Sequence, residues 1–270
     1  MKPSRFPALQ ASAVAASRAA GELMRRHLRR TKKVNEACHH DIKLDLDVRC
    51  QRVISRSLAA DFPGIPVLGE EGIDDRVRTA PARWVVDPID GTVNYAHGIP
   101  HAAVSIALQL REGTGYRTVV GVVHDPFMDE TWTAITGRAA LLNGRRIHVS
   151  KRRKLDESIV SLGFAKSTES LDHMLPVFNE LVYRVRKIRL MGSAALALTY
   201  VADGRFDGYV EAGIRLWDIA AGGLIVECAG GVFESGETGE EFRHTLMCNN
   251  RLIDRELRSA ARAGLARNPR

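Results

Sequence analysis

The sequence of 270 residues has no long hydrophobic run. No stretch approaches the roughly 18 consecutive apolar residues that a membrane-spanning helix needs, so we expect no membrane association. The segment from Met1 to Ala20 also lacks a continuous apolar core, which argues against a secretory signal. Cysteine is scarce: the four cysteines are scattered without a Cys-x-x-Cys pair. This spacing argues against a disulfide framework or a zinc site and predicts reduced thiols in a cytoplasmic protein.

An excess of positive charge is confined to the ends of the chain. The formal net charge is +7, yet residues 1–33 carry nine Lys or Arg against Glu22 alone, and residues 251–270 carry six Arg against two acids, so the centre is acidic. One interpretation is that Arg25, Arg26, Arg29 and Arg30 form the solvated face of a helix and that the C-terminal arginines form a frayed tail. The alternative is a basic surface for nucleic acid or another anionic partner. No aromatic residues interleave these arginines, which favours the first interpretation.

The remaining composition is that of a globular protein, with 45% hydrophobic and 26% charged residues. The length suits one large domain or two small ones. The spacing of apolar residues predicts helices over Pro7–Arg30, Leu44–Ala60, Leu171–Arg184, Ala194–Ala202 and Asp218–Ala229. Compact apolar runs between turn residues predict strands at Val67–Leu68, Arg83–Asp87, Ala103–Leu110, Thr118–Val123, Thr131–Ile135, Ala139–Leu142, Ser158–Leu162, Ile188–Leu190, Gly208–Glu211 and Thr245–Cys248.

This order of elements predicts a layered sandwich of the α+β or α/β class, in which two stacked sheets alternate with layers of helices. A segment rich in Lys and Arg, residues 145–155, is the predicted boundary between two halves of one compact unit. The N-terminal α+β half spans residues 1–150 and carries most of the candidate metal ligands. The C-terminal α/β half spans residues 151–270 and carries Asp218 and the residues expected to face a substrate.

The segment Asp87-Pro88-Ile89-Asp90-Gly91-Thr92 carries the most informative chemical pattern. An apolar strand ends at Asp87, and Asp90 follows three residues later. Two carboxylates buried beside a strand are costly unless a cation or hydrogen bonds compensate them. The carbonyl of Ile89 is available to the same cation. Gly91-Thr92 is predicted to begin a helix, whose unpaired amides would suit a phosphate.

Two acidic positions elsewhere complement this segment. Glu70 and Glu71 lie in a glycine-bounded turn after a strand, and Asp218 lies at the start of a predicted helix. Taken alone, Asp218 is typical of an N-cap, and the two glutamates are typical of a solvated loop. Together with the two aspartates of the strand, these residues form an all-oxygen set that favours Mg²⁺ or Mn²⁺ over zinc. Two such ions about 3.5–4 Å apart would suit phosphate-ester hydrolysis.

These motifs resemble those of the inositol monophosphatase family, whose members are Mg²⁺-dependent, Li⁺-sensitive phosphatases. Asp-Pro-Ile-Asp-Gly-Thr at residues 87–92 resembles the family's first motif, Trp-Asp-Ile-Ala-Ala-Gly at residues 217–222 its second, and Gly-Glu-Glu at residues 69–71 its upstream glutamate element. The similarity extends in the right order over residues 40–235. It implies the layered fold shared by inositol monophosphatase and fructose-1,6-bisphosphatase.

The resemblance implies a set of metal ligands at the matching positions. Glu70, Asp87 and the Ile89 carbonyl would hold a first Mg²⁺, and Asp87, Asp90 and Asp218 would hold a second. A third ion could be held loosely by Glu70 through water, and Mn²⁺ is the alternative cation.

The resemblance also implies three catalytic residues, Asp47, Glu70 and Thr92. Thr92, positioned by Asp47, would orient or deprotonate the attacking water. Substrate contacts are implied for Asp90, Gly91, Thr92, Gly192, Ala194, Glu211 and Asp218. Among these, the amides of residues 91 and 92 would cradle the phosphate, and Glu211 with the backbone of residues 192 and 194 would meet substrate hydroxyls.

Two departures from the family pattern precede these motifs. Residues 41–47 keep Asp41 and Asp47 but have Lys43-Leu44 where the family usually has Val-Thr. Glu36 stands where family members often carry a lysine near the metals, with Lys32 and Lys33 upstream. The role of Asp47 follows from the resemblance alone, and the alternative is that it belongs to the polar start of a helix.

The sequence therefore predicts a Mg²⁺-dependent phosphomonoesterase acting on a small polyol or sugar phosphate, with inositol monophosphate as the first choice. Fructose 1,6-bisphosphate, histidinol phosphate, nucleotide 3′-phosphates and NADP are the alternative substrates. An alternative of another class is a protein of the same fold that binds RNA or a transcription complex, motivated by the basic segment Arg184–Lys187 and the arginine-rich ends. The resemblance also suggests a homodimer.

Overall fold

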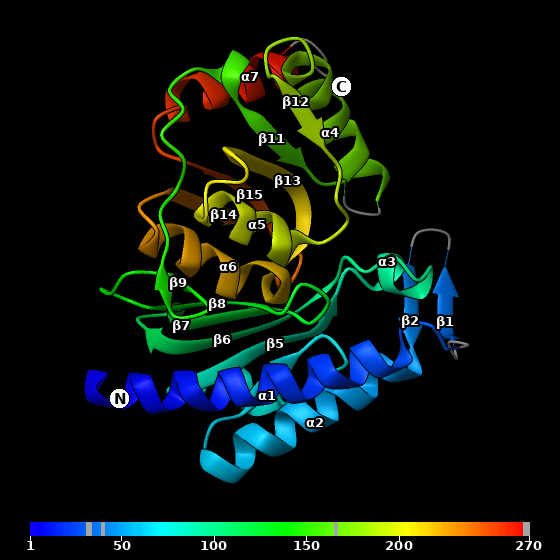
Figure 1. Ribbon diagram of the computed structural model, residues 1–270, viewed down its shortest axis with the longest axis vertical. Coiled ribbons are helices and arrows are strands. Elements are labelled where there is room, and N and C mark those ends of the chain that lie inside the picture. The colour runs from blue at the N-terminus through cyan, green and yellow to red at the C-terminus, as the bar shows by residue number, and fades with distance from the viewer. Residues whose placement is uncertain (31–33, 39–40, 165–166, 267–270) are drawn as a thin grey trace.

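The computed structural model describes residues 1–30, 34–38, 41–164 and 167–266. Its helices are α1 (Phe6–His27), α2 (Asp45–Asp61), α3 (Thr92–Ala96), α4 (Thr168–Leu181), α5 (Ala194–Ala202), α6 (Leu216–Cys228) and α7 (Asp254–Ala266). Figure 1 shows five alternating layers: α1 and α2, a first sheet, α5 and α6, a second sheet, and finally α4 and α7. The predicted layered sandwich is confirmed.

The larger sheet lies between α1 and α2 on one face and the middle helices on the other. Its strands are β3 (Val67–Gly69), β4 (Gly72–Ile73), β5 (Ala82–Asp90), β6 (Ala103–Glu112), β7 (Gly115–Asp125), β8 (Glu130–Ile135), β9 (Leu141–Leu142) and β10 (Arg145–Arg146). The order is β10-β9-β8-β7-β6-β5-β3-β4, with β3 and β5 parallel and all other neighbours antiparallel. All nine residues of β5 are buried, because helices cover both faces of the sheet.

The smaller sheet has the order β12-β11-β13-β15-β14. Its strands are β11 (Ile159–Leu162), β12 (Lys187–Arg189), β13 (Gly208–Arg215), β14 (Val232–Glu237) and β15 (Arg243–Asn249). Strand β11 is parallel to both of its neighbours, whereas β15 is antiparallel to β13 and β14. The predicted strands of this half are confirmed, and β14 was not predicted.

Arg255, Arg258 and Arg262 lie on a packed helix, so the prediction that the C-terminal arginines form a frayed tail is wrong for residues 254–266. Within this segment, Leu257 and Ala260 are fully buried, and they pack with Met174 and Leu181 of α4. Arg258 pairs with Asp254 and Glu234 on the polar side. The apolar residues recur at helical spacing between the arginines, so one face of the helix is apolar and can be buried.

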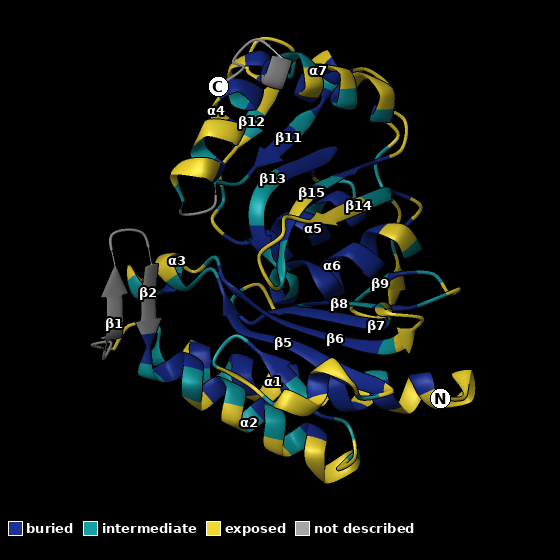
Figure 2. Ribbon diagram, turned by 180° about the vertical axis from the view of Figure 1, so that it is seen from behind, coloured by how far each residue is buried: buried dark blue, intermediate teal, exposed yellow. Residues whose placement is uncertain are grey.

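Helix α6 is buried over most of its length because it lies between the two sheets, as the dark blue colouring in Figure 2 shows. It approaches β7 so closely that a Cβ added at Gly121 would lie 2.6 Å from the carbonyl oxygen of Ala221. The middle layer therefore contacts both sheets. The division into residues 1–150 and 151–270 stays a prediction about the sequence.

The exposed features of the N-terminal part agree with a solvated helix face. Arg25 and Arg26 are exposed and both bind Glu22 of the same helix, and α1 ends at His27 rather than at the predicted Arg30. None of the described helices has the length and apolar content needed to cross a bilayer.

A small hairpin of β1 (Val34–Cys38) and β2 (Asp41–Leu44) lies beside α3 (Figure 1). The residues that depart from the family pattern fall here. Lys32 and Lys33 lie outside the described residues, and so do the side chains of Glu36 and Lys43.

Candidate active site

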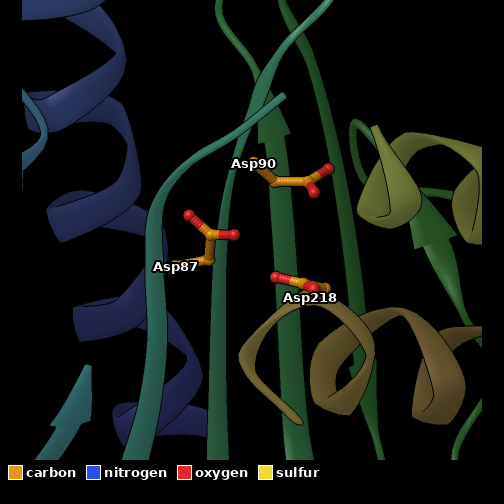
Figure 3. Close-up of side chains that lie close together, drawn as sticks. All are labelled: Asp87, Asp90 and Asp218. Carbon is orange, nitrogen blue, oxygen red and sulfur yellow. The ribbon is translucent and has the colours of Figure 1, made fainter. Parts of the chain in front are cut away.

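Three carboxylates gather between the end of β5 and the start of α6. Asp87 and Asp90 come from β5 and Asp218 from α6 (Figure 3). Each offers an oxygen, and these three oxygens all lie within 4.8 Å of one another. Asp87 and Asp90 are only 2% and 6% exposed, and Asp218 is half-buried. Segments more than 120 residues apart thus meet at one acidic cluster.

A bulge in β5 explains why two aspartates three residues apart face the same site. In a regular strand, residues separated by three point to opposite faces of the sheet. Here Asp87 pairs with Ser105 of β6 and Asp90 pairs with Ala103, so three steps along β5 match two steps along β6. The extra residue turns the strand and brings both carboxylates to one side.

Asp87 accepts a hydrogen bond from its own strand. Its Oδ1 accepts the backbone amide of Ile89 at 2.9 Å. Burial raises the pKa of this carboxyl well above its usual range, and neighbouring carboxylates raise it further, Glu70 first and then Asp218. The carboxylates of the cluster therefore lie close enough to disfavour each other's charged form.

Asp90 is held by the N-terminus of α5. It accepts the hydroxyl of Ser193 and the amides of Ala194 at 3.2 Å and Ala195 at 2.9 Å. Burial and the charge of Asp218 nevertheless raise its pKa to about 7. The Ala194 amide was predicted to serve the substrate, but in the structure it donates to this carboxylate.

Asp218 is the third residue of α6 rather than its first. The helix begins at Leu216, and Asp218 Oδ2 accepts the amide of Arg215 at 3.0 Å. The hydroxyl of Ser105 in β6 donates to the carbonyl of Trp217 at 3.0 Å and so attaches the start of the helix to the larger sheet. Asp218 therefore makes the hydrogen bond of an N3 residue to the amide of the N-cap, and the same side chain also belongs to the acidic cluster.

The predicted glutamates occupy the turn between β3 and β4. The amide of Glu70 donates to the carbonyl of Val86 at 3.3 Å, and its charge acts on Asp87, so Glu70 borders the cluster. Among the described residues, the set of oxygens within 4.8 Å does not include it. The charge of Glu71 raises the pKa of Asp47, and its amide donates to Gln51 Oε1 at 3.0 Å.

Thr92 and Asp47 meet beside the cluster, as predicted. The Thr92 hydroxyl donates to the carbonyl of Ile89 at 2.8 Å and lies 3.4 Å from Asp47 Oδ1. The Ile89 carbonyl, predicted to face a cation, accepts this hydroxyl here. Asp47 is 2% exposed, its Oδ2 accepts the Leu44 amide at 2.6 Å, and burial raises its pKa to about 7.

Gly91 is the N-cap of α3 and has a left-handed conformation, with φ of 93°. A Cβ at this position would lie 3.0 Å from the His101 carbonyl and 3.1 Å from the Gly192 carbonyl. The side chain of Asn94 ties these segments together, because it donates to the carbonyls of His101 at 3.0 Å and Met191 at 2.8 Å. Gly192 thus lies against the loop that follows β5, as the prediction of a shared site requires.

Glu211 lies on β13 and is half-buried. The hydroxyl of Tyr209 donates to its Oε2. The phenol also lies in the field of the acidic cluster, because burial, Glu211, Asp90 and Asp218 all raise the pKa of Tyr209 well above its usual range.

Sequence reasoning assigned no role to Ser193, Asn94, Gln51 or Tyr209. Ser193 could have been found as an N-cap, since a serine precedes a run of helix-forming residues and accepts the Leu196 amide. Asn94, Gln51 and Tyr209 act through tertiary contacts, which cannot be predicted from a local sequence pattern.

The donor set fits a divalent cation. The cluster consists of carboxylate oxygens, two of its members are buried, and the pKa values of these two are raised by burial first and then by repulsion from neighbouring carboxylates. A hard cation with oxygen ligands would relieve this repulsion.

Comparison with known proteins gives matches over nearly the whole chain. The model of the inositol monophosphatase family matches residues 8–266. Nus factor SuhB of Pseudomonas aeruginosa is 40% identical over 237 residues, which cover 85% of this chain and 86% of that protein. Inositol monophosphatase 1 of Solanum lycopersicum is 37% identical over 236 residues, which cover 85% of each chain. The solved structure of the extragenic suppressor protein SuhB from Bartonella henselae has a TM-score of 0.86 at 34% identity, and the match covers 94% of this chain and 98% of that one.

Proposed function

Since the chain belongs to the inositol monophosphatase family and is a phosphatase, we propose that it hydrolyses a phosphate monoester of a small polyol or sugar, with inositol monophosphate as the first substrate. The convergence of Asp87, Asp90 and Asp218 supports this proposal most directly. The name of the relative from Solanum lycopersicum supports the choice of substrate.

Two Mg²⁺ ions are the proposed cofactors. Glu70, Asp87 and the Ile89 carbonyl would hold one, and Asp87, Asp90 and Asp218 the other. When bound, such cations lower the pKa of an attacking water and neutralise charge on the leaving oxygen. Li⁺ sensitivity, a third loosely held ion and substitution by Mn²⁺ belong to the same proposal.

The residues of the chain would supply the proton transfer and the orientation. Asp47 has a pKa near 7, so above that pH it can accept the Thr92 hydroxyl proton while this hydroxyl orients the attacking water. The amides of Gly91 and Thr92 would hold the phosphate, and Glu211 would accept hydrogen bonds from substrate hydroxyls.

The first experiment measures phosphate release from inositol 1-phosphate with Mg²⁺, with EDTA and with added Li⁺. We expect activity that requires Mg²⁺ and is lost in the Asp90→Asn variant. The matched control is Asp75→Asn, because the Asp75 side chain is 99% exposed. Full activity of the Asp90→Asn variant would contradict the assignment. Fructose 1,6-bisphosphate, histidinol phosphate, a nucleotide 3′-phosphate and NADP are the competing substrates in the same assay.

A second candidate function is binding of RNA or a transcription complex. Relatives from several bacteria carry the name Nus factor SuhB. A surface hollow of about 540 Å³ is lined by Lys154, Tyr183, Arg184 and Arg255, together with acidic residues, and the Tyr183 side chain is 90% exposed. An aromatic ring among cations suits single-stranded nucleic acid.

Salt-dependent RNA binding tests this second candidate. Replacement of Lys154, Arg184 and Arg255 by glutamate should weaken binding and flatten its salt dependence, because phosphate contacts release counterions. Phosphate release should stay at the wild-type rate in this variant. Equal RNA binding by wild type and variant would contradict the use of this surface.

A homodimer and a cytoplasmic location complete the proposal. Light scattering during gel filtration tests the first, and cell fractionation tests the second.

A further inference from the structure

Tyr209 and Glu211 are two residues apart on β13, so both side chains lie on the same face of the smaller sheet. Tyr209 is 2% exposed and packs in the core between the sheets. Its hydroxyl donates to Glu211 Oε2. A buried, rigid ring therefore holds one oxygen of the more exposed carboxylate.

Gly163 limits the same carboxylate from the neighbouring strand. Strand β11 runs parallel to β13, with Ser161 beside Tyr209 and Leu162 beside Val210. The amide of Gly163 donates to the Val210 carbonyl at 3.1 Å, so the register continues and places Gly163 next to Glu211.

The carboxylate of Glu211 fills the space that a side chain at position 163 would take. A Cβ on Gly163 would lie 1.8 Å from Glu211 Oε2 and 2.2 Å from its Cδ. Gly163 does not have a positive φ, so the backbone conformation itself does not demand glycine. What this position requires is the absence of a Cβ.

We propose that Tyr209 and Gly163 are positioning residues that fix the Glu211 carboxylate toward the substrate and thereby set the preference for phosphate esters of polyols. This inference rests on the proposed function. The Glu211 carboxylate already accepts the Tyr209 hydroxyl and packs against the backbone of Gly163, so it loses little rotamer freedom when it binds a substrate hydroxyl. Esters that lack neighbouring hydroxyls gain nothing from this arrangement.

The experiment compares kcat/KM for inositol 1-phosphate and for p-nitrophenyl phosphate, which has no aliphatic hydroxyl, in the presence of Mg²⁺. We expect Tyr209→Phe and Gly163→Ala each to lower the preference for inositol 1-phosphate roughly 10-fold, because a hydrogen bond to a charged group is lost or misplaced. The loss should appear mainly in KM, since these residues hold a group that binds the substrate.

A double-mutant cycle separates positioning from general damage. Tyr209→Phe should cost no further preference when Glu211 is already replaced by alanine, because the phenol acts through that carboxylate and alanine leaves it no side-chain acceptor. Tyr116→Phe is the matched control, because it removes a phenol that donates to the backbone carbonyls of residues 77 and 80 and not to Glu211. It should keep the wild-type preference.

Gly163→Ala should fold, because only the far end of the flexible Glu211 side chain must move, and thermal melting checks this. If it does not fold, Tyr209→Phe carries the test alone. An equal loss with both esters, or additive losses in the cycle, would overturn the positioning role while leaving the phosphatase proposal intact. A wild type that hydrolyses both esters without preference would do the same, whereas a wild type that hydrolyses neither would overturn both.

Discussion

Replacing Asp87 by asparagine should stabilise the protein without metal and abolish its response to metal. The variant keeps an oxygen that accepts the Ile89 amide, and its new amide group can donate toward Asp218. It removes one charge from a set of carboxylate oxygens that lie within 4.8 Å of one another. Because asparagine has nearly the same shape as aspartate, the change removes the buried charge and leaves the packing of the side chain in place.

The expected size follows from the geometry. Two unit charges at this separation repel by about 3–4 kcal/mol at an effective dielectric constant of about 20. In the wild type, protonation of one of these carboxyls relieves part of the repulsion. We expect the free energy of unfolding of the Asp87→Asn variant in EDTA at pH 8 to exceed that of the wild type by about 2–4 kcal/mol, and its melting temperature to be roughly 5–10 °C higher.

The pH dependence has a defined sign. The folded-state pKa values of Asp87 and Asp90 are raised, that of Asp90 to about 7. The folded wild type therefore binds more protons than the unfolded chain, and its stability without metal falls as pH rises from about 4 to about 7. The advantage of the variant should be small at pH 5 and larger at pH 8.

Differential scanning calorimetry in EDTA and in excess Mg²⁺ measures these quantities. Mg²⁺ should raise the melting temperature of the wild type and have little effect on the variant, which lacks a ligand shared by both proposed ions. The exposed Asp75→Asn change serves as the control and should leave both curves within about 0.5 kcal/mol. A variant that melts below the wild type in EDTA at pH 8 would refute the argument that repulsion dominates at this site.

Three further predictions concern neighbouring features. Ser193→Ala should weaken Mg²⁺ affinity roughly 10-fold by calorimetric titration, because Asp90 loses its hydroxyl donor; unaltered affinity would show that the α5 amides suffice. Wild-type kcat should rise as pH passes through about 7, where Asp47 ionises, and Asp47→Asn should lower kcat by about 100-fold and remove this limb; a variant with the wild-type profile would exclude the Thr92–Asp47 role. Gly121→Ala should destabilise the fold by roughly 2–3 kcal/mol in urea titration, since its Cβ would meet the α6 backbone; Gly64→Ala, where a Cβ meets nothing within 4 Å, should not.

Strands and helices with strong apolar patterns were predictable because their burial follows directly from the side chains. Strand β5 is an example: its apolar run is buried on both faces. The edge strand β14 was not predicted, since four of its six residues are exposed and no alternation marks it. Helix α7 was not predicted because arginines alternate with its few apolar residues, which obscures the helical spacing in the sequence. In the structure, Leu257 and its apolar neighbours on this helix are buried in the core.

The site was predictable to the level of residue identity but not of geometry. The motif around Asp87 and the family resemblance predicted that Asp87, Asp90 and Asp218 belong to one site. The structure places these three side chains together. The bulge that aligns Asp90 with Asp87 depends on pairing with β6, and the hydrogen bond from Ser193 depends on the packing of α5. Both arise from contacts between segments distant in sequence, which local patterns do not encode.

The hydrogen bonds around the cluster show how the fold tolerates its repulsion. Asp90 accepts Ser193 and two amides at the start of α5, Asp218 accepts the Arg215 amide at the start of α6, and Asp87 accepts one amide from its own strand. Helix N-termini of the middle layer therefore supply most of the positive potential, and that layer contacts both sheets. A cation held between β5 and α6 would add one more link between the larger sheet and the middle layer. Its binding should consequently raise the unfolding temperature of both halves together as one transition, rather than that of the N-terminal half alone.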